Sequence, residues 1–231
     1  MVNPNHTIGH RVVRADMWLI VVPGLIAIAV TVIRAIGEVN HWPKPLVNPD
    51  LCGKAILGVV WLVPIFGALF AWRLVARCQP PKSLPFVFGC ALVALALKLV
   101  GTYLMETSRF VYGLRIGINL LLTGTGLVTL AVAWPALFKV LFAYGYISRI
   151  PVAVVQFLAL RGHWGTHYDA LGNFPPIGFW PTYVRVSLVP NVFFMEAYTV
   201  IVGSLVGSAF VAVMQRLQTL RTGKSPVSIG Q

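Results

Sequence analysis

Long apolar runs separated by short basic segments dominate this sequence. Five of them, at residues 17–33, 55–72, 84–105, 116–138 and 192–214, each contain at most one charged side chain. A helix needs about 20 mostly apolar residues to cross a hydrocarbon layer about 30 Å thick, and each run approaches or exceeds that length. Only 10% of the chain is charged, whereas soluble domains contain roughly 25%. The sequence therefore predicts an all-α, polytopic transmembrane helix bundle.

A sixth span is predicted at residues 147–161, where the apolar pattern is weaker. In one interpretation this helix extends back to Val140, which places Arg149 inside it. In the other, the preceding helix runs to about Tyr146 and the next one starts at Pro151, because proline suits a first helical turn. Both interpretations predict that the segment crosses the membrane, which gives six helices.

The distribution of arginine and lysine sets the expected orientation, because cytoplasmic segments carry an excess of both. With the N-terminus inside, the inner segments hold Arg11, Arg14, Arg73, Arg77, Lys82, Lys139, Arg149, Arg216, Arg221 and Lys224. The outer segments hold Arg34, Lys44, Lys54, Arg109, Arg115, Arg161 and Arg185, together with the acids Glu38, Asp50, Glu106 and Asp169. We therefore expect both termini to be cytoplasmic, which requires an even number of helices.

The whole chain, residues 1–231, is expected to form a single transmembrane domain in a cell inner membrane. The first apolar run is too long for a signal-peptide core, so it is interpreted as a retained helix. Residues 161–191 are predicted to form an ordered outer loop, because they are rich in Trp, Tyr, Phe, Pro and Gly and such rings settle at the headgroup level. Residues 221–231 are predicted to be a disordered tail.

Several functional classes are disfavoured by the composition. The net charge of +12 could suggest nucleic-acid binding, but the basic residues are scattered between apolar runs and form no single patch. No cofactor is expected, because haem ligation inside the membrane needs histidines within the spans and a phosphate-binding GxxxxGK[ST] motif is missing from the sequence. The three cysteines show no CxxC spacing, so thiol redox chemistry is not predicted.

The strongest candidate for chemistry lies in the outer loop, at His163, Trp164, His167, Tyr168 and Asp169. Two histidines four residues apart, followed by a carboxylate, could face one metal ion on a helix, and a metal-bound water would be a nucleophile. Against this, Gly165 weakens a helix at this point and the glutamate of the zinc-protease pattern is missing from the sequence. The alternative is an interfacial loop whose side chains bind headgroups and cap the preceding helix.

Two ionisable residues lie within apolar runs, Lys98 in the third and Glu196 in the last. Counting along the helices places both about 7–10 Å below the outer surface. A charge in the membrane is costly alone and usually faces a partner inside the bundle. We therefore predict an intramembrane ion pair between Lys98 and Glu196, with separate snorkelling of each side chain to the interface as the alternative.

Small residues repeat at helical spacing in two runs. Gly203 and Gly207 lie on one face of the last helix, and Gly113 and Gly117 begin the fourth. Such stripes allow helix backbones to approach closely in lipid. They predict tight packing, either within the chain or against a second copy or another membrane subunit.

One segment resembles a known group of proteins. The stretch RIPVAVVQFLALRGHWGTHYDALGNFPP, within residues 149–176, is similar to a stretch in uncharacterised bacterial polytopic inner-membrane proteins of about this size. The resemblance implies a bacterial membrane protein with a distinctive outer loop. It implies no activity.

Taken together, these features favour a non-enzymatic subunit or accessory of a larger membrane assembly, in contact with lipid. A conduction path would require more polar residues within the spans. A small-solute or lipid transporter is the second hypothesis, and it would require a polar cavity reaching Lys98, Glu196, Asn119 or Gln156. A metal-assisted enzyme at the outer face is the third hypothesis, and it would require His163, His167 and Asp169 to converge.

Overall fold

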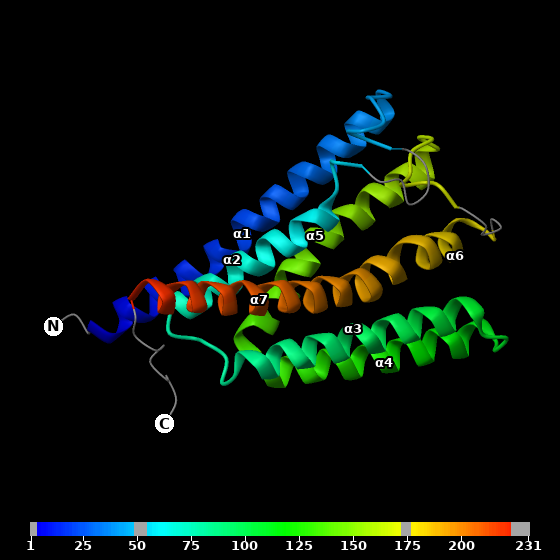
Figure 1. Cartoon of the computed structure of the whole chain (residues 1–231). Coiled ribbons are helices and arrows are strands. Elements are labelled where there is room, and N and C mark those ends of the chain that lie inside the picture. Colours follow the sequence, from blue (N-terminus) through cyan, green and yellow to red (C-terminus); the bar gives the residue numbers. More distant parts are fainter. Residues whose placement is uncertain (1–3, 49–54, 172–176, 223–231) are drawn as a thin grey trace. The chain divides into compact units, whose positions relative to one another are not determined.

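A computed structural model describes residues 4–48, 55–171 and 177–222 of the chain. Every regular element in these ranges is helical (Figure 1). Six helices are long and apolar enough to cross a membrane: Met17–Val39, Val59–Ala76, Leu84–Thr107, Gly113–Ala133, Pro135–Gly162 and Phe179–Arg221. The predicted all-α fold with six membrane-spanning helices is therefore confirmed.

Two compact units make up the chain, and each contains residues from two distant stretches. Unit 1 comprises Met1–Leu62 and Ala143–Phe194. Unit 2 comprises Val63–Phe142 and Met195–Gln231. The division passes through one long helix and through the helical stretch near the C-terminus, so neither unit is a continuous piece of sequence.

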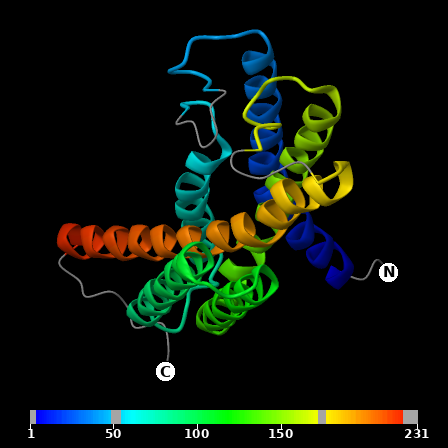
Figure 2. The same ribbon diagram turned by 90° about the vertical axis from the view of Figure 1, so that its right-hand side faces the viewer.

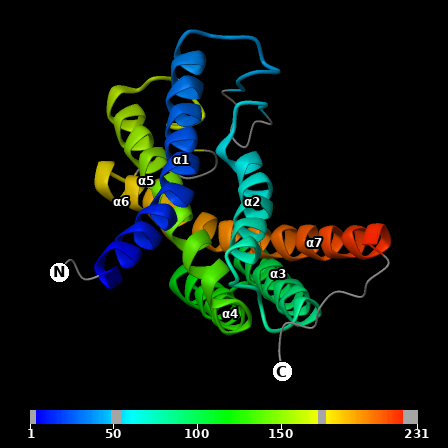
Figure 3. The same ribbon diagram turned by 90° about the vertical axis from the view of Figure 1, so that its left-hand side faces the viewer.

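Unit 1 contains α1 (Pro4–Val39), a short 3₁₀ turn (Val59–Trp61), the C-terminal part of α5 (Pro135–Gly162) and α6 (Phe179–Tyr183). This part of α5 lies beside α1 (Figures 2 and 3). The two helices come close at Gly24, where a Cβ atom would collide with the Ile147 side chain. The glycine therefore permits a contact that any larger residue would disturb.

Unit 2 contains α2 (Leu62–Ala76), α3 (Leu84–Thr107), α4 (Tyr112–Ala133) and α7 (Glu196–Thr222). The α3 and α4 helices run side by side (Figure 1). A Cβ on Gly126 of α4 would lie 2.9 Å from the Cα atom of Ala94 on α3. Small residues thus bring the two backbones together, as expected where lipid gives apolar side chains no reason to cluster.

The boundary between the fourth and fifth helices differs from the prediction. The fourth helix was predicted to reach residue 138, but α4 ends at Ala133 and α5 begins at Pro135. Trp134 between them has a φ of −146° and a ψ of 81°, because the ring of a following proline disfavours the helical conformation. The fifth helix, predicted at residues 147–161, is therefore nearly twice as long and runs on to Gly162.

Arg149 and Pro151 both lie inside α5, and the Arg149 side chain is buried. The interpretation in which the fifth helix begins at Pro151 is therefore wrong. The alternative, which extends the helix back to Val140 and accepts an arginine within it, describes the structure better, although α5 begins five residues earlier, at Pro135. The apolar stretch alone was too short to reveal this, because the helix continues through residues that a hydropathy argument treats as a boundary.

The last helical stretch begins earlier than the predicted residue 192. Helical backbone is continuous from Phe179, through two π-helical segments at Val184–Leu188 and Pro190–Met195, into α7. This stretch comprises 43 residues, about twice the number that one crossing needs. The predicted outer loop at 161–191 is thus non-helical only up to Gly178 in the described part, and the predicted tail at 221–231 lies almost entirely outside the described residues.

Candidate functional site: the outer loop and its carboxylate anchor

The candidate loop after α5 is fastened to a glutamate at the end of α1. Glu38 lies on the last turn of α1 and its side chain is fully buried. A carboxylate removed from water in this way is stable only when donors or a positive charge replace its hydration. The sequence identified Glu38 only as an outer acidic residue, so its partners are new information.

Three donors converge on the Glu38 carboxylate. Arg34, one turn earlier on α1, donates from Nε at 2.8 Å. The backbone N–H of His167 donates at 3.0 Å, and Nδ1 of the same residue lies 2.6 Å from the carboxylate. An ionised carboxylate can only accept, so Nδ1 carries the proton and Nε2 is the unprotonated nitrogen in a neutral ring. Charge-assisted bonds of this kind are roughly twice as strong as neutral ones.

Asp169 shapes the loop from within. Its carboxylate accepts from the backbone N–H groups of Gly165 at 2.9 Å and Thr166 at 2.6 Å, and from the Thr166 hydroxyl at 2.8 Å. Aspartate side chains commonly close turns by binding nearby backbone N–H groups. Gly165 adopts a φ of +69°, a left-handed conformation in which glycine avoids the steric cost of a side chain. The segment from Gly165 to Asp169 is therefore a turn closed by its own hydrogen bonds.

Tyr168 inserts into the space between α1 and α5. Its ring is buried in a cluster with Ala35 and Ala159, and its hydroxyl donates to the Thr31 carbonyl at 3.4 Å. Burial raises the pKa of the Tyr168 hydroxyl, so the group stays protonated and available as a donor. Tyr168 and His167 thus dock the loop through different chemistry, one by apolar burial and one by charge.

His163 and Trp164 lie at the start of the loop and are exposed. His163 ends the helical conformation with a φ of +49°. The Trp164 ring packs against Gly162, where a Cβ atom would collide with the indole. Trp164 also lines an apolar groove of about 350 Å³, together with residues of α1 and Val155 of α5.

The predicted metal ligands do not assemble in this structure. Among the residues it describes, no group of three His, Cys, Asp or Glu side chains is placed to hold a metal ion. His167 Nδ1 is engaged by Glu38, and both Asp169 oxygens are engaged by the turn. The unprotonated Nε2 of His167 could still ligate a metal while Nδ1–H is bonded to Glu38, so a site at His163, His167 and Asp169 stays a prediction for metal analysis.

In unit 2, Lys98 donates from Nζ to Oδ1 of Asn119 on α4, at 3.3 Å. The same oxygen accepts from the Thr123 hydroxyl at 3.1 Å, and both Asn119 and Thr123 are buried. The predicted partner Glu196 is also buried in unit 2, and the Lys98–Glu196 pair stays a prediction. Sequence reasoning missed the amide bridge, although Asn119 was recognised as a polar residue within a span.

A second polar network lies in unit 1, between α5 and the π-helical stretch. Oε1 of Gln156 accepts from the Ser187 hydroxyl at 2.8 Å and from Asn191 Nδ2 at 2.6 Å. Sequence reasoning did not anticipate it, because Ser187 and Asn191 lie in what was predicted to be loop. Ser187 and Asn191 are four residues apart, and Asn191 Nδ2 also donates to the Ser187 carbonyl at 2.9 Å, but Gln156 is 31 and 35 residues away from them, which local spacing cannot pair.

The two glycine stripes have different surroundings. Cβ atoms on Gly203 and Gly207 would collide with Leu141 and with the Gly67 carbonyl of α2, respectively. This stripe is therefore filled by the chain itself, and it is not available to a second chain in this arrangement. Cβ atoms on Gly113 and Gly117 would meet nothing within 4 Å, so that face of α4 is open.

Comparisons with family models, with curated proteins and with solved structures returned no match. The resemblance at residues 149–176 to bacterial inner-membrane proteins stays an expectation.

Proposed function

We propose that this multi-pass membrane protein is a structural or accessory subunit of a bacterial inner-membrane assembly, with both termini in the cytoplasm. The observation that supports the proposal is that the polar side chains form hydrogen bonds between parts of the same chain. Lys98, Asn119 and Thr123 join α3 to α4, and Gln156 joins α5 to the π-helical stretch. Glu38 joins α1 to the outer loop. These groups fasten the chain to itself.

A transporter would use such groups differently. Polar residues on a conduction path face water or the solute, and they exchange partners as the solute moves. Here Asn119 is buried and its Oδ1 accepts from both Lys98 and Thr123, and two grooves in the described part of the chain are lined almost wholly by apolar side chains. Fastening therefore accounts for these residues better than conduction does.

The open glycine face of α4 supplies the contact expected of a subunit. Gly113 and Gly117 are exposed and have free space above them, whereas the comparable Gly203 stripe is filled within the chain. In lipid, a stripe of this kind lets a second helix approach closely and gain van der Waals contact. We place the partner helix, from another copy or another subunit, on this face.

The test is native gel electrophoresis of the full chain extracted from its own membranes in mild detergent. The proposal predicts a complex larger than the 25.2 kDa chain, and Gly117→Leu should release the single chain because a leucine blocks close approach. Gly89→Leu, an exposed glycine of α3 with equally free space, is the matched control and should leave the complex intact.

A transport function predicts another outcome. The wild type would migrate as a single chain, and vesicles containing the purified protein would pass a solute at a rate that Asn119→Leu abolishes. Either result, a lone chain in native membranes or flux that depends on Asn119, would contradict the subunit proposal.

A further inference from the structure

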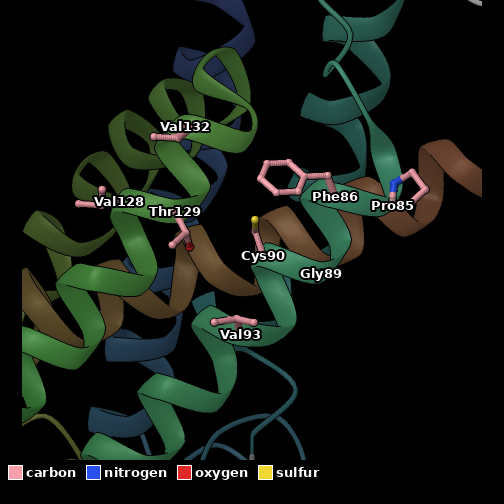
Figure 4. Close-up of a pocket in the computed structure, with 8 residues that line it drawn as sticks. All are labelled: Pro85, Phe86, Gly89, Cys90, Val93, Val128, Thr129 and Val132. Atoms are coloured by element: carbon pink, nitrogen blue, oxygen red, sulfur yellow. The ribbon is translucent and has the colours of Figure 1, made fainter.

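An apolar groove of about 640 Å³ runs between α3 and α4 in unit 2. In Figure 4 the side chains of Phe86 and Cys90 project from α3 towards α4, and Thr129 projects from α4 towards them. Both walls come from one pair of helices, so the groove belongs entirely to unit 2. Its lining includes Pro85, Phe86, Gly89 and Val93 of α3, and Val128 and Val132 of α4.

The walls of the groove are exposed to whatever surrounds the helices. Phe86 is 57% exposed, Val93 53%, Val128 64% and Val132 71%. Both helices are membrane spans, so these side chains contact hydrocarbon. Gly89 leaves the groove open, because a Cβ there would meet nothing within 4 Å. A narrow apolar groove along two spans has the shape of a binding site for a lipid acyl chain.

One end of the groove is held next to a basic loop. Lys82 lies three residues before Pro85, and Ser83 caps α3 by accepting from the Phe86 N–H at 3.4 Å. The indole N–H of Trp134, at the end of α4, donates to the Gln79 carbonyl at 3.1 Å. This bond ties the α2–α3 loop, which carries Arg77 and Lys82, to the end of α4 where the groove also ends.

The charged residues of unit 2 in the segments around this end of the groove are all basic. Arg73, Arg77, Lys82 and Lys139 lie within residues 63–83 and 130–142, and neither range contains an acid. The Arg73 guanidinium lies 5.1 Å from the centre of the Trp72 ring, a Trp–Arg pairing typical of the headgroup level. Basic residues there attract anionic lipids, at about 1 kcal/mol for each lysine or arginine.

We propose that this groove binds one anionic phospholipid, with an acyl chain along the Phe86–Val93 and Val128–Val132 walls and its phosphate beside Lys82. The apolar walls account for the chain and the acid-free basic loop accounts for the headgroup. The expected orientation of the protein places this lipid in the cytoplasmic leaflet. The inference does not depend on the proposed subunit role.

The test uses the purified full chain in nanodiscs of phosphatidylcholine that contain phosphatidylglycerol with a photoreactive acyl chain. Labelling should map to residues 85–93 or 128–132. Gly89→Leu should reduce labelling about tenfold, the equivalent of losing contact with about two buried methylenes. Lys82→Gln should reduce it about fivefold, the loss of one headgroup charge contact. Gly117→Leu, the same change at a glycine outside the groove, should leave labelling unchanged.

Three results would overturn the lipid site. Equal labelling by a photoreactive phosphatidylcholine would show that the headgroup is not selected. Unchanged labelling in Gly89→Leu would show that the groove is not the site. Cross-links between two protein chains at residues 85–93 would show that a protein helix occupies it. If Gly89→Leu does not elute as the wild type does, Val128→Phe fills the groove from its exposed wall and gives the same test.

Gly117→Leu tests the complex and Gly89→Leu tests the lipid site, and each variant is the control for the other experiment. Failure of one proposal can therefore be distinguished from failure of the other. Loss of the complex with normal lipid labelling concerns only the subunit proposal. Loss of selective labelling with an intact complex concerns only the lipid site.

Discussion

The outer end of unit 1 and the helix contacts of unit 2 are held together in opposite ways. In unit 1, a buried carboxylate on α1 collects three donors and fixes a loop 129 residues further along the chain. In unit 2, glycines let α2 and α7 meet so closely that Gly67 and Gly203 leave no room for a Cβ atom. One contact depends on charge and the other on the absence of a side chain.

The difference follows from the surroundings of each contact. The loop follows the end of the apolar span Pro135–Gly162, so a strong polar anchor is needed to outweigh hydration and the ordering of the loop. Within lipid, no water competes for the contacts between helices. The helices are stabilised by van der Waals contact, which is greatest when their backbones approach closely. Substitutions should therefore act locally in the first region and globally in the second.

Gly67→Ala should have the largest effect. The new Cβ atom would lie 2.7 Å from the Cα and carbonyl oxygen of Gly203, and backbone atoms cannot move aside as a flexible side chain can. We expect the free energy of unfolding to fall by about 3 kcal/mol, measured by titration from mild detergent into dodecyl sulfate. Gly124→Ala, where a Cβ meets nothing within 4 Å, should leave it equal or up to about 1 kcal/mol higher. Similar losses in both variants would contradict the proposed close contact.

Glu38→Ala should release the outer loop without unfolding the chain. It removes the acceptor of the His167 N–H, so exchange of that amide should accelerate about 10- to 100-fold, in line with ~1.5–3 kcal/mol for a bond to a charged group. The Thr166 amide, which Asp169 holds, should be less affected, and Asp169→Ala should show the reverse pattern. Equal acceleration of both amides by both variants would show that the loop has no separate anchor.

Raising the pH should weaken the docking of Tyr168. Burial raises the pKa of its hydroxyl in the docked loop, so at high pH the phenol ionises first in the undocked state. The contribution is complete below the ordinary tyrosine pKa of about 10 and declines as pH rises towards the higher value of the docked loop. We expect proteolysis within 163–171 to increase above about pH 10, and Tyr168→Phe to lose this increase at a cost of about 0.5 kcal/mol. An identical pH profile in the phenylalanine variant would refute the assignment.

Metal removal should have the smallest effect. Because no three His, Cys, Asp or Glu side chains among the described residues are placed to hold a metal ion, the purified protein should contain no stoichiometric transition metal, and a chelator should leave loop proteolysis unchanged. Elemental analysis of the wild type and of His167→Ala provides the check. One equivalent of metal in the wild type, lost in His167→Ala, would restore the outer metal site.

The sequence was sufficient to predict the helical class and the number of spans, because hydropathy depends only on local composition. The loop predicted at residues 161–191 was too long at its C-terminal end, because the structure is helical again from Phe179. The sequence could not place the end of α4, because Trp134-Pro135 lies inside an uninterrupted apolar run. There the backbone geometry of a residue before proline, rather than hydropathy, ends the helix.

Partners were harder to predict than positions. Glu38 and His167 are separated by 129 residues, and nothing in their local sequence links them. Asp169 bonds only three or four residues back, so its role as a turn former was within reach of sequence reasoning. The spacing of Asp169 from His163 and His167 suggested instead that it was a metal ligand. Gln156 and Asn191 meet across 35 residues, whereas helical spacing predicts neighbours only within one helix.

A double-mutant cycle between Glu38 and His167 would test whether the polar residues of the outer loop are committed to fastening it. Exchange of the Tyr168 and Asp169 amides would be measured in the wild type, Glu38→Gln, His167→Ala and the double variant. If the Nδ1 contact at 2.6 Å holds the loop, the two changes should be coupled by about 1–2 kcal/mol, the double variant exchanging little faster than the worse single variant. Additive effects would show that Glu38 and His167 act independently, and the interpretation of this loop as a fastened cap would then be wrong.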